Sequence, residues 1–326
     1  MAAKPKPFAP YEVDWGAFAP LRLRARIVAE GVYSGMHRSV RKGSGVEFGG
    51  QRPYVPGDDL RFVDKRSLLK HDRLLVREFE TETDRAVWLV VDATSSMSFR
   101  GKGPGAKFAF AALLAASIAR VSLTSGDPVG LVVLGGEGAR TLPAAVGREA
   151  WDRVVWALSS TKPAGDWSQG GEDVLRALLP VYERARRGSV VVLLSDLVDL
   201  PERALSDFGG LATRGRRAFA VQVLSPDEAT LPFGEQARFT SLEGGVVVEA
   251  DPVQARDAYL AELEALRARW RDDLLSRGGA LVTSQTTSDP VGVVRELLLA
   301  VSGTSAARDP SRSPEARPPG GGASGA

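Results

Sequence analysis

The sequence predicts an α/β fold in which helices flank a mainly parallel β-sheet. Short, continuous apolar runs, typical of strands buried on both faces, alternate along the chain with helical segments. Strands that alternate with helices in this way indicate parallel pairing through helical crossovers. The 326 residues are 44% hydrophobic and 25% charged. This composition is globular, and the length suffices for a sizeable core.

The first part of the chain is less regular, and we predict an irregular N-terminal subdomain over residues 17–80. Residues 1–16 precede it and should be flexible, because Pro and Lys dominate their start. Residues 18–35 are expected to form a helix with its apolar side chains on one side. The following block, residues 38–64, is polar and Gly-rich. Residues 74–80 are expected to be extended and to lead into the core.

Regular elements fill residues 81–303, which we assign to one domain. The expected strands are 86–92, 128–136, 189–199, 217–226 and 280–287, with a hairpin at 237–250. The expected helices are 105–126, 148–160, 172–188, 201–215, 251–279 and 289–303. In the longest helix, Asp251 is a natural N-cap, Pro252 suits the first position and Gly278 ends the element. The tail, residues 304–326, is rich in Pro, Gly and Ser and is expected to be disordered.

Composition excludes several kinds of site. The chain has no cysteine, so disulfides, thiolate metal sites and cysteine nucleophiles are absent. Its two histidines, His37 and His71, lie in no zinc or serine-hydrolase motif. A net charge of +2 is too weak to indicate nucleic-acid binding. No signal peptide and no stretch approaching the roughly 20 apolar residues of a membrane span is recognised, which predicts a cytoplasmic protein.

Polar side chains follow two of the predicted buried strands. Asp92, Thr94 and Ser96 lie on one strand-to-helix turn, and Asp196 ends another apolar run. In open parallel sheets, ligand sites form beyond the carboxyl ends of the strands. Carboxylates and hydroxyls are hard oxygen ligands suited to Mg²⁺ or Mn²⁺. A third loop offers Glu172 beside Asp173. The residues therefore predict a metal site, with helix capping by the same turn as the alternative.

A family resemblance rests on these residues. DATSS after VWLVV, with GGED and LLSD downstream, resembles the von Willebrand factor A domain and its metal-ion-dependent adhesion site. The resemblance implies a von Willebrand A-like fold and a Mg²⁺ or Mn²⁺ site formed by Asp92, Thr94, Ser96, Glu172 and Asp196. Thr94 stands for a serine of the motif, and Glu172 stands where the family has a threonine. The glutamate would add negative charge and weaken the attraction for a partner's carboxylate.

The polar block carries a second resemblance. Residues 43–80 resemble the signature of the bacterial "domain of unknown function 58" family, with Lys65 where the family has a tryptophan. The resemblance spans about residues 22–303. It is met by Gly43, Gly45, Glu47, Phe48, Arg52, Tyr54, Gly57, Asp58, Asp59, Arg61, Asp64, Arg77, Phe79 and Glu80.

Members of this family are typically linked with MoxR-type AAA+ ATPases, so the resemblance implies such a partner. Alternating charges in the block suit a salt-bridged subdomain or a surface that recognises a charged partner. The candidate partner-binding residues are Arg41, Glu47, Arg52, Tyr54, Asp58, Asp59, Arg61 and Asp64.

The sequence therefore favours a non-enzymatic interaction module, an adaptor or co-chaperone of the ATPase acting on an unknown client. No nucleic acid is expected as a partner. GKGPGAKF, residues 101–108, resembles a P-loop but has Phe108 where Ser or Thr is required, so nucleotide binding is disfavoured. The alternatives are a metal-dependent hydrolase or nuclease, or a scaffold whose metal site has degenerated. No catalytic residue is assigned.

Overall fold

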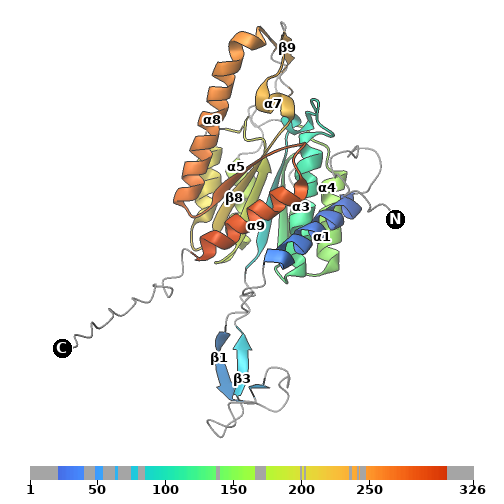
Figure 1. Cartoon of the computed structure of the whole chain (residues 1–326). Coiled ribbons are helices and arrows are strands. Elements are labelled where there is room, and N and C mark those ends of the chain that lie inside the picture. The colour runs from blue at the N-terminus through green and yellow to red at the C-terminus, as the bar shows by residue number, and fades with distance from the viewer. Residues whose placement is uncertain are drawn as a thin grey trace, which may run out of the picture.

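A six-stranded sheet between two layers of helices forms the body of the protein in the computed structural model (Figure 1). The described residues are 21–39, 48–53, 63–64, 75–79, 85–136, 140–165, 174–198, 200–201, 203–234, 237–240, 242 and 247–306. The strands lie in the order β11 (Ala280–Gln285), β8 (Arg217–Leu224), β7 (Val190–Ser195), β4 (Val87–Ala93), β5 (Val129–Gly135) and β6 (Arg140–Ala145).

The sheet confirms the predicted fold class. All neighbouring strands are parallel except β5 and β6, which pair antiparallel. The sequence did not indicate β6, because RTLPAA has no continuous apolar run and its residues are half-exposed or exposed. Pro143 lies within this strand, and proline suits an edge position because it has no N–H to donate.

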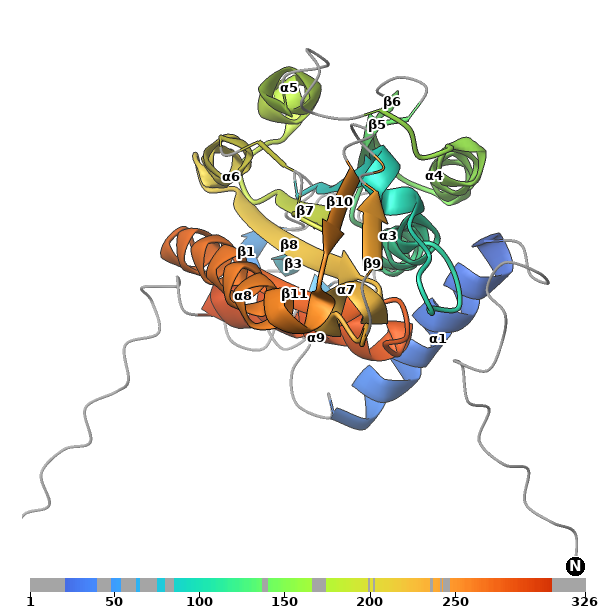
Figure 2. The same cartoon turned by 90° about the horizontal axis from the view of Figure 1, so that it is seen from above.

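Helices cover both faces of the sheet (Figure 2). The first face carries α1 (Leu21–Ser39), α3 (Lys107–Thr124), α4 (Arg148–Ser160) and α9 (Pro290–Ala306). The second face carries α5 (Val174–Arg184), α6 (Ala204–Gly209) and α8 (Pro252–Ser276). Side chains alternate along β4, so that Leu89 and Val91 enter the first core and Trp88 and Val90 the second.

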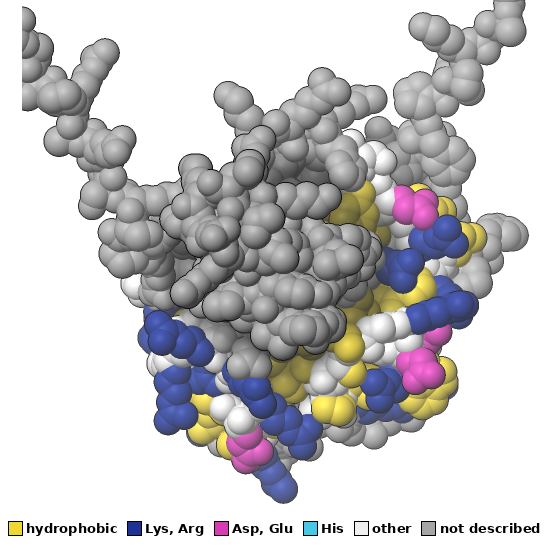
Figure 3. All heavy atoms as spheres, turned by 90° about the horizontal axis from the view of Figure 1, so that it is seen from below, with side chains coloured by type: hydrophobic (Ala, Val, Ile, Leu, Met, Phe, Trp, Pro, Cys, Tyr) yellow, Lys and Arg dark blue, Asp and Glu magenta, His cyan; other side chains and the backbone are white. Residues whose placement is uncertain are grey.

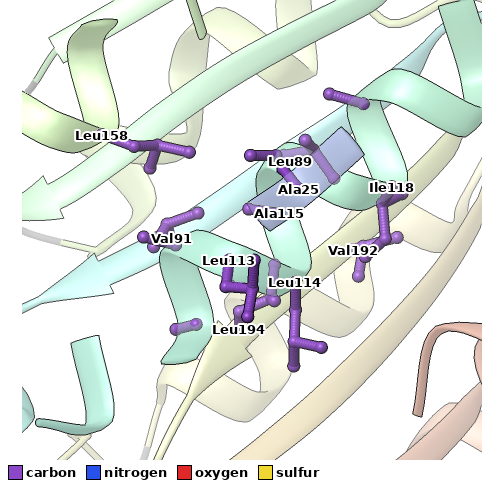
Figure 4. Packing of buried hydrophobic residues seen from close by; sticks show 14 of the residues in the cluster. Ala25, Leu89, Val91, Leu113, Leu114, Ala115, Ile118, Leu158, Val192 and Leu194 are labelled. Atoms are coloured by element: carbon purple, nitrogen blue, oxygen red, sulfur yellow. The ribbon is translucent and has the colours of Figure 1, made fainter. Parts of the chain in front are cut away.

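The first core is built around α3 (Figure 4). Leu113, Ala115 and Ile118 pack with Leu89 and Val192 of the sheet, and all five are buried. Alanines on α3 let the helix approach the sheet closely. By length and apolar composition α3 could span a membrane, although no stretch of that kind was expected from the sequence. However, 78% of this helix is buried inside the protein, and a long helix of a protein core has the same length and composition.

A close approach fixes the packing of Trp88 on the second face. Trp88 of β4 pairs in register with Gly130 of β5. A Cβ at Gly130 would lie 2.6 Å from the indole ring. Any larger residue there would displace the buried indole, so the strand needs glycine at this position.

The helix α1 belongs to the same core as α3. Although the sequence pattern groups it with the polar block that follows, Ala25, Val28 and Val32 are buried in the first core. The Tyr33 hydroxyl donates to the carbonyl of Val121 on α3 at 2.9 Å. A Cβ on Gly31 would lie 2.9 Å from Val291 of α9. The N-terminal helix thus packs against both α3 and the C-terminal helix.

The remaining elements are small. A separate antiparallel sheet has the order β1 (Phe48–Pro53), β3 (Leu75–Phe79) and β2 (Val63–Asp64). Its β3 confirms the extended segment predicted at 74–80, whereas Gly49 and Gly50 gave no sign of β1. The hairpin predicted at 237–250 is present as β9 (Ala237–Thr240) and β10 (Val247–Ala250). The short α7 (Pro226–Thr230), η2 (Ser95–Ser98) and η3 (Gly210–Ala212) complete the described elements.

The expected ends of the long helix α8 are present. The Asp251 carboxylate accepts from the N–H of Val253 at 2.9 Å, and Pro252 is the first helical residue. Gly278 follows the helix with φ +74°, a conformation that favours glycine. The flexible segment expected at 1–16 lies outside the described residues. The expected tail does so from residue 307, because α9 continues to Ala306.

Candidate functional site

The candidate site lies where β4 and β7 end side by side. Asp92 is the penultimate residue of β4, and Asp196 follows β7 directly. These strands are parallel neighbours, so both carboxylates lie at the same edge of the sheet. Both side chains are buried, with 1% and 2% exposure. Thr94 and Ser96, on the turn after β4, are buried as well.

Both carboxylate oxygens of Asp92 accept hydrogen bonds from nearby residues. Its Oδ1 accepts from the N–H of Thr94 at 3.0 Å and from the Thr94 hydroxyl at 2.9 Å. Its Oδ2 accepts from the Ser195 hydroxyl at 2.6 Å. Thr94 Oγ1 also lies 3.1 Å from Ser96 Oγ. Sequence reasoning missed Ser195, because a serine at the end of an apolar run carries no specific signal.

The pKa of Asp92 is raised to about 7. Burial is the largest cause, and the neighbouring charge of Asp196 adds to it. The hydrogen bonds from Ser195 and Thr94 act in the opposite direction, because they stabilise the carboxylate. Burial and the neighbouring carboxylate therefore outweigh three hydrogen bonds, and Asp92 takes up a proton near neutral pH.

Asp196 is paired with a buried lysine. The Lys107 ammonium donates to Asp196 Oδ2 at 2.7 Å and to Glu228 Oε1 at 2.5 Å. Lys107 is 1% exposed, so its charge is balanced inside the protein rather than by water. Burial lowers the pKa of Lys107, but Asp196 and Glu228 together raise it further, so the net shift is upward. The lysine therefore stays charged.

Neither Lys107 nor Glu228 was singled out on sequence as part of this site. They are 121 residues apart, and Lys107 is 89 residues from Asp196. The signal that could have pointed to Glu228 is the capping box of α7. There, Ser225 Oγ accepts from the N–H of Glu228, and the Glu228 carboxylate accepts from the N–H of Ser225. That pattern places the carboxylate at the end of β8, two strands from β4.

The turn after β7 has an unusual backbone. Leu197 is buried and has φ +65°, in the left-handed region that a branched apolar residue rarely adopts. Its N–H donates to Ser195 Oγ at 3.0 Å, and the N–H of Val198 donates to Asp196 Oδ1 at 3.2 Å. The buried Gln222 amide donates to the Asp196 carbonyl at 2.9 Å. These bonds hold the strained turn, and with it the Asp196 carboxylate, in one geometry.

The loop that carries Glu172 begins beside this site, but Glu172 itself lies outside the described residues. The N–H of Ala164 donates to the Ala93 carbonyl at 2.9 Å, and the N–H of Ser95 donates to the Gly165 carbonyl at 2.9 Å. The chain then enters residues 166–173. The described contacts therefore bring the start of this loop to the DATSS turn.

The described donors fit a divalent cation poorly. Among the described residues, no three Asp, Glu or His side chains converge as a metal-ligand group. The oxygens of Asp92 accept from Thr94 and Ser195, and Asp196 is ion-paired with Lys107. An ammonium beside one of the expected carboxylate ligands repels a second cation. The geometry is that of a closed hydrogen-bonded and ion-paired cluster.

The loop that resembles a P-loop has a different role. Its lysine is Lys107, whose ammonium is buried between Asp196 and Glu228. In a P-loop this amine must reach the phosphates of a nucleotide. Here the amine is paired with two carboxylates inside the protein.

The expected partner-binding residues fall on the small sheet or outside the described part. Arg52 lies on β1, in register with Val76 of β3, and Asp64 lies on β2, in register with Leu75 of β3. The other expected residues are outside the described ranges: Arg41, Glu47, Tyr54, Asp58, Asp59 and Arg61. The small sheet thus places Arg52 and Asp64 on the two strands that flank β3.

Charged and hollow surfaces lie away from the Asp92 cluster. A cavity of about 590 Å³ lies over α1, α3 and α4, with Arg22, Arg120 and Trp151 among its lining residues. Lys and Arg side chains gather on the face seen from below in Figure 3, at the end of the sheet where the parallel strands begin. There the Arg216 guanidinium donates to the carbonyls of Tyr182 and Ala185 near the end of α5, as expected for a cation at a helix end.

Comparisons with known proteins identify relatives over most of the chain. The family described as "Protein of unknown function DUF58" matches residues 50–269. The uncharacterized protein Rv1480 of Mycobacterium tuberculosis is 28% identical over 279 residues, which are 84% of this chain and 85% of that protein. An uncharacterized protein of Mycobacterium bovis matches to the same extent.

Solved structures resemble the domain more distantly. An aerotolerance-related membrane protein from Bacteroides fragilis is 16% identical with a TM-score of 0.44, over 67% of this chain and 99% of that one. BatB from Bacteroides thetaiotaomicron is 15% identical with a TM-score of 0.42, over 68% and 99%. A von Willebrand factor type A structure from Catenulispora acidiphila is 11% identical with a TM-score of 0.40, over 71% and 44%. The mainly parallel sheet between two helical layers is an α/β fold.

Proposed function

Because the chain belongs to the family of proteins of unknown function DUF58, we propose that it is a non-enzymatic protein-interaction module. Its binding face is the edge of the sheet where β4 and β7 end. The observation that carries the proposal is the closed state of this edge: Asp92, Lys107 and Asp196 are each at most 2% exposed. A general acid, base or nucleophile must come within hydrogen-bonding distance of its substrate. These groups are instead engaged with one another and with neighbouring side chains.

The edge offers a rigid surface above this closed cluster. Val198 follows Asp196 by two residues and is 42% exposed, whereas its neighbour Leu197 is buried. Ser98 and Lys102, from the segment between β4 and α3, are exposed. An apolar side chain on an ordered turn with polar neighbours has the composition of a protein-protein contact. The buried hydrogen bonds hold the turn in place before a partner arrives, which lowers the entropy cost of binding.

The partner in this proposal is a MoxR-type AAA+ ATPase, and the module acts as its adaptor or co-chaperone on a client complex in the cytoplasm. The support is the family resemblance, together with the occupied state of Lys107, since a paired lysine supplies no phosphate contact here. ATP hydrolysis then belongs to the partner. Residues of the signature block, Arg52 and Asp64 among them, form a second contact.

Affinity purification from the source cell tests the proposal. The wild-type chain is compared with Val198→Arg, which places a long charged side chain on the proposed face. A matched control, Leu299→Arg, changes an apolar residue of α9 that is 64% exposed. We expect mass spectrometry to identify an AAA+ ATPase with the wild type and with Leu299→Arg, and to find it reduced at least about tenfold with Val198→Arg. That loss corresponds to about 1.4 kcal/mol of binding free energy.

Two results would contradict the proposal. Recovery of a different stable partner, without an AAA+ ATPase, would refute the adaptor role. Phosphodiesterase or phosphatase turnover by the purified chain, lost in Asp92→Ala, would favour the alternative of a metal-dependent hydrolase or nuclease.

A further inference from the structure

We propose that the Lys107 ammonium is the resident cation of the candidate site. It takes the place that a divalent metal ion holds in an adhesion-type site, so this edge stays folded without a metal. The proposal concerns the site alone and does not depend on the identity of the partner.

The ammonium is bound as a cation in a built site. It lies 2.7 Å from Asp196 and 2.5 Å from Glu228, and 5.9 Å from the centre of the Phe99 ring. These groups come from three different parts of the fold: the end of β7, the helix α7 and the segment after β4. Two carboxylates and an aromatic face thus surround one ammonium, and both kinds of group stabilise its charge.

The position of Lys107 along its helix makes this pairing necessary. Lys107 is the first residue of α3, an 18-residue helix whose N-cap residue makes no side-chain capping bond. The N-terminus of a helix carries partial positive charge, so a cation there is unfavourable. Burial adds a further cost. Asp196 and Glu228 offset both costs, which links the start of α3 to the ends of β7 and β8.

The other described ligands expected for a metal, Asp92, Thr94 and Ser96, are engaged in hydrogen bonds within the protein. Asp92 accepts three hydrogen bonds, two of them from Thr94 and one from Ser195. The Thr94 hydroxyl is also within hydrogen-bonding distance of Ser96. A divalent ion near Asp196 would have to displace these bonds and would lie close to the ammonium, which repels it. The described part of the cluster therefore holds a cation of its own.

Metal binding by the full-length wild type is the first test. The protein is dialysed against EDTA, its metal content is measured by mass spectrometry, and MgCl₂ or MnCl₂ is titrated by calorimetry. We expect no bound metal, no saturable heat and the same unfolding temperature with EDTA as with either salt. Saturable heat that Asp92→Asn abolishes, or a lower unfolding temperature in EDTA, would overturn the proposal. A failure to find the ATPase in cells would leave this result unchanged.

Removal of the ammonium is the second test. Lys107→Met keeps the approximate length of the side chain but leaves Asp196 and Glu228 without a cation. Lys102→Met, on the exposed loop nearby, is the matched control. We expect a lower unfolding temperature for Lys107→Met only, and partial recovery with MgCl₂ that the wild type does not show. If Lys107→Met does not fold, the triple variant Lys107→Met, Asp196→Asn, Glu228→Gln should restore folding. Wild-type stability of Lys107→Met, no recovery with MgCl₂, or an unfolded triple variant contradicts the proposal.

Discussion

At the scale of single residues, two neighbouring carboxylates have opposite environments. Asp196 is stabilised as an anion by the Lys107 ammonium, whereas Asp92 has only neutral donors, Ser195 and Thr94. Burial and the charge of Asp196 therefore raise the pKa of Asp92 to about 7. Two neighbouring carboxyl groups in such different environments take different roles. Here one carboxylate balances the lysine, and the other can bind a proton.

The raised pKa of Asp92 predicts that stability falls as pH rises toward neutral. The unfolded chain has the ordinary pKa of 3.8, so between that value and about 7 the folded state binds more protons. The stabilisation that Asp92 contributes is fully present below its pKa in the unfolded chain, and it is lost as pH rises through its pKa in the folded protein. The slope attributable to one proton is at most about 1.4 kcal/mol per pH unit.

Chemical unfolding at several pH values between 4 and 8 measures this slope. Asp92→Asn keeps the shape of the neutral acid and should remove the dependence, so the difference between variant and wild type should change with pH. Asp251→Asn, at an exposed N-cap, is the control and should leave the wild-type slope in place. A wild-type slope that persists in Asp92→Asn would show that Asp92 is not its source.

At the scale of elements, burial on both faces decides what the sequence can predict. Four parallel strands, β4, β5, β7 and β8, are almost entirely buried and mainly apolar, whereas the edge strand β11 is only partly buried and begins with an apolar run; all five were predicted. The strand β6 and the five-residue α7 were not, because an edge strand needs no apolar run and a single helical turn has no periodicity. Asp92 and Asp196 were likewise predicted as site residues, because each lies at the end of an apolar run. The partners Lys107 and Glu228 depend on how distant segments pack, which no local pattern records.

The junction between α8 and β11 predicts a sensitive glycine. A Cβ at Gly279 would lie 1.8 Å from the backbone carbonyl oxygen of Ala218 in β8, so the strand must move to accommodate it. Gly279→Ala should lower the free energy of unfolding by about 1–3 kcal/mol or more, as overpacking does. Gly234→Ala is the matched control, because no atom lies within 4 Å of its added Cβ. Urea unfolding compares the two, and equal stabilities would contradict the close approach.

At the scale of the whole molecule, the two ends of the sheet carry different surfaces. The carboxyl ends of the strands form the closed cluster and the exposed Val198. The opposite end carries many Lys and Arg side chains (Figure 3). Between them, α1 and α9, the first and last described helices, lie in the same layer (Figure 2). Contacts between the first and last described helices therefore complete the first core.

Because one side of α1 is buried in the core, substitutions at neighbouring positions on it should change stability by very different amounts. Val28 is buried in the first core, whereas Ile27 is 57% exposed. Val28→Asp buries a carboxylate without a partner and should cost several kcal/mol, roughly 3 or more. Ile27→Asp, one residue away, should change stability by less than about 0.5 kcal/mol. Thermal unfolding compares them, and similar losses would show that α1 does not dock as described.

The contact between α1 and α9 has a consequence for biosynthesis. Gly31 of α1 faces Val291 of α9, and 259 residues between them must be translated before this pair can form. Synthesis at about 5–20 residues per second makes that interval some tens of seconds. During it, the apolar face of α1 can be covered only by α3 and α4, which leave the ribosome earlier. The apolar face of α1 therefore stays only partly buried until α9 leaves the ribosome. Chaperones near the ribosome exit would meet α1 during that interval.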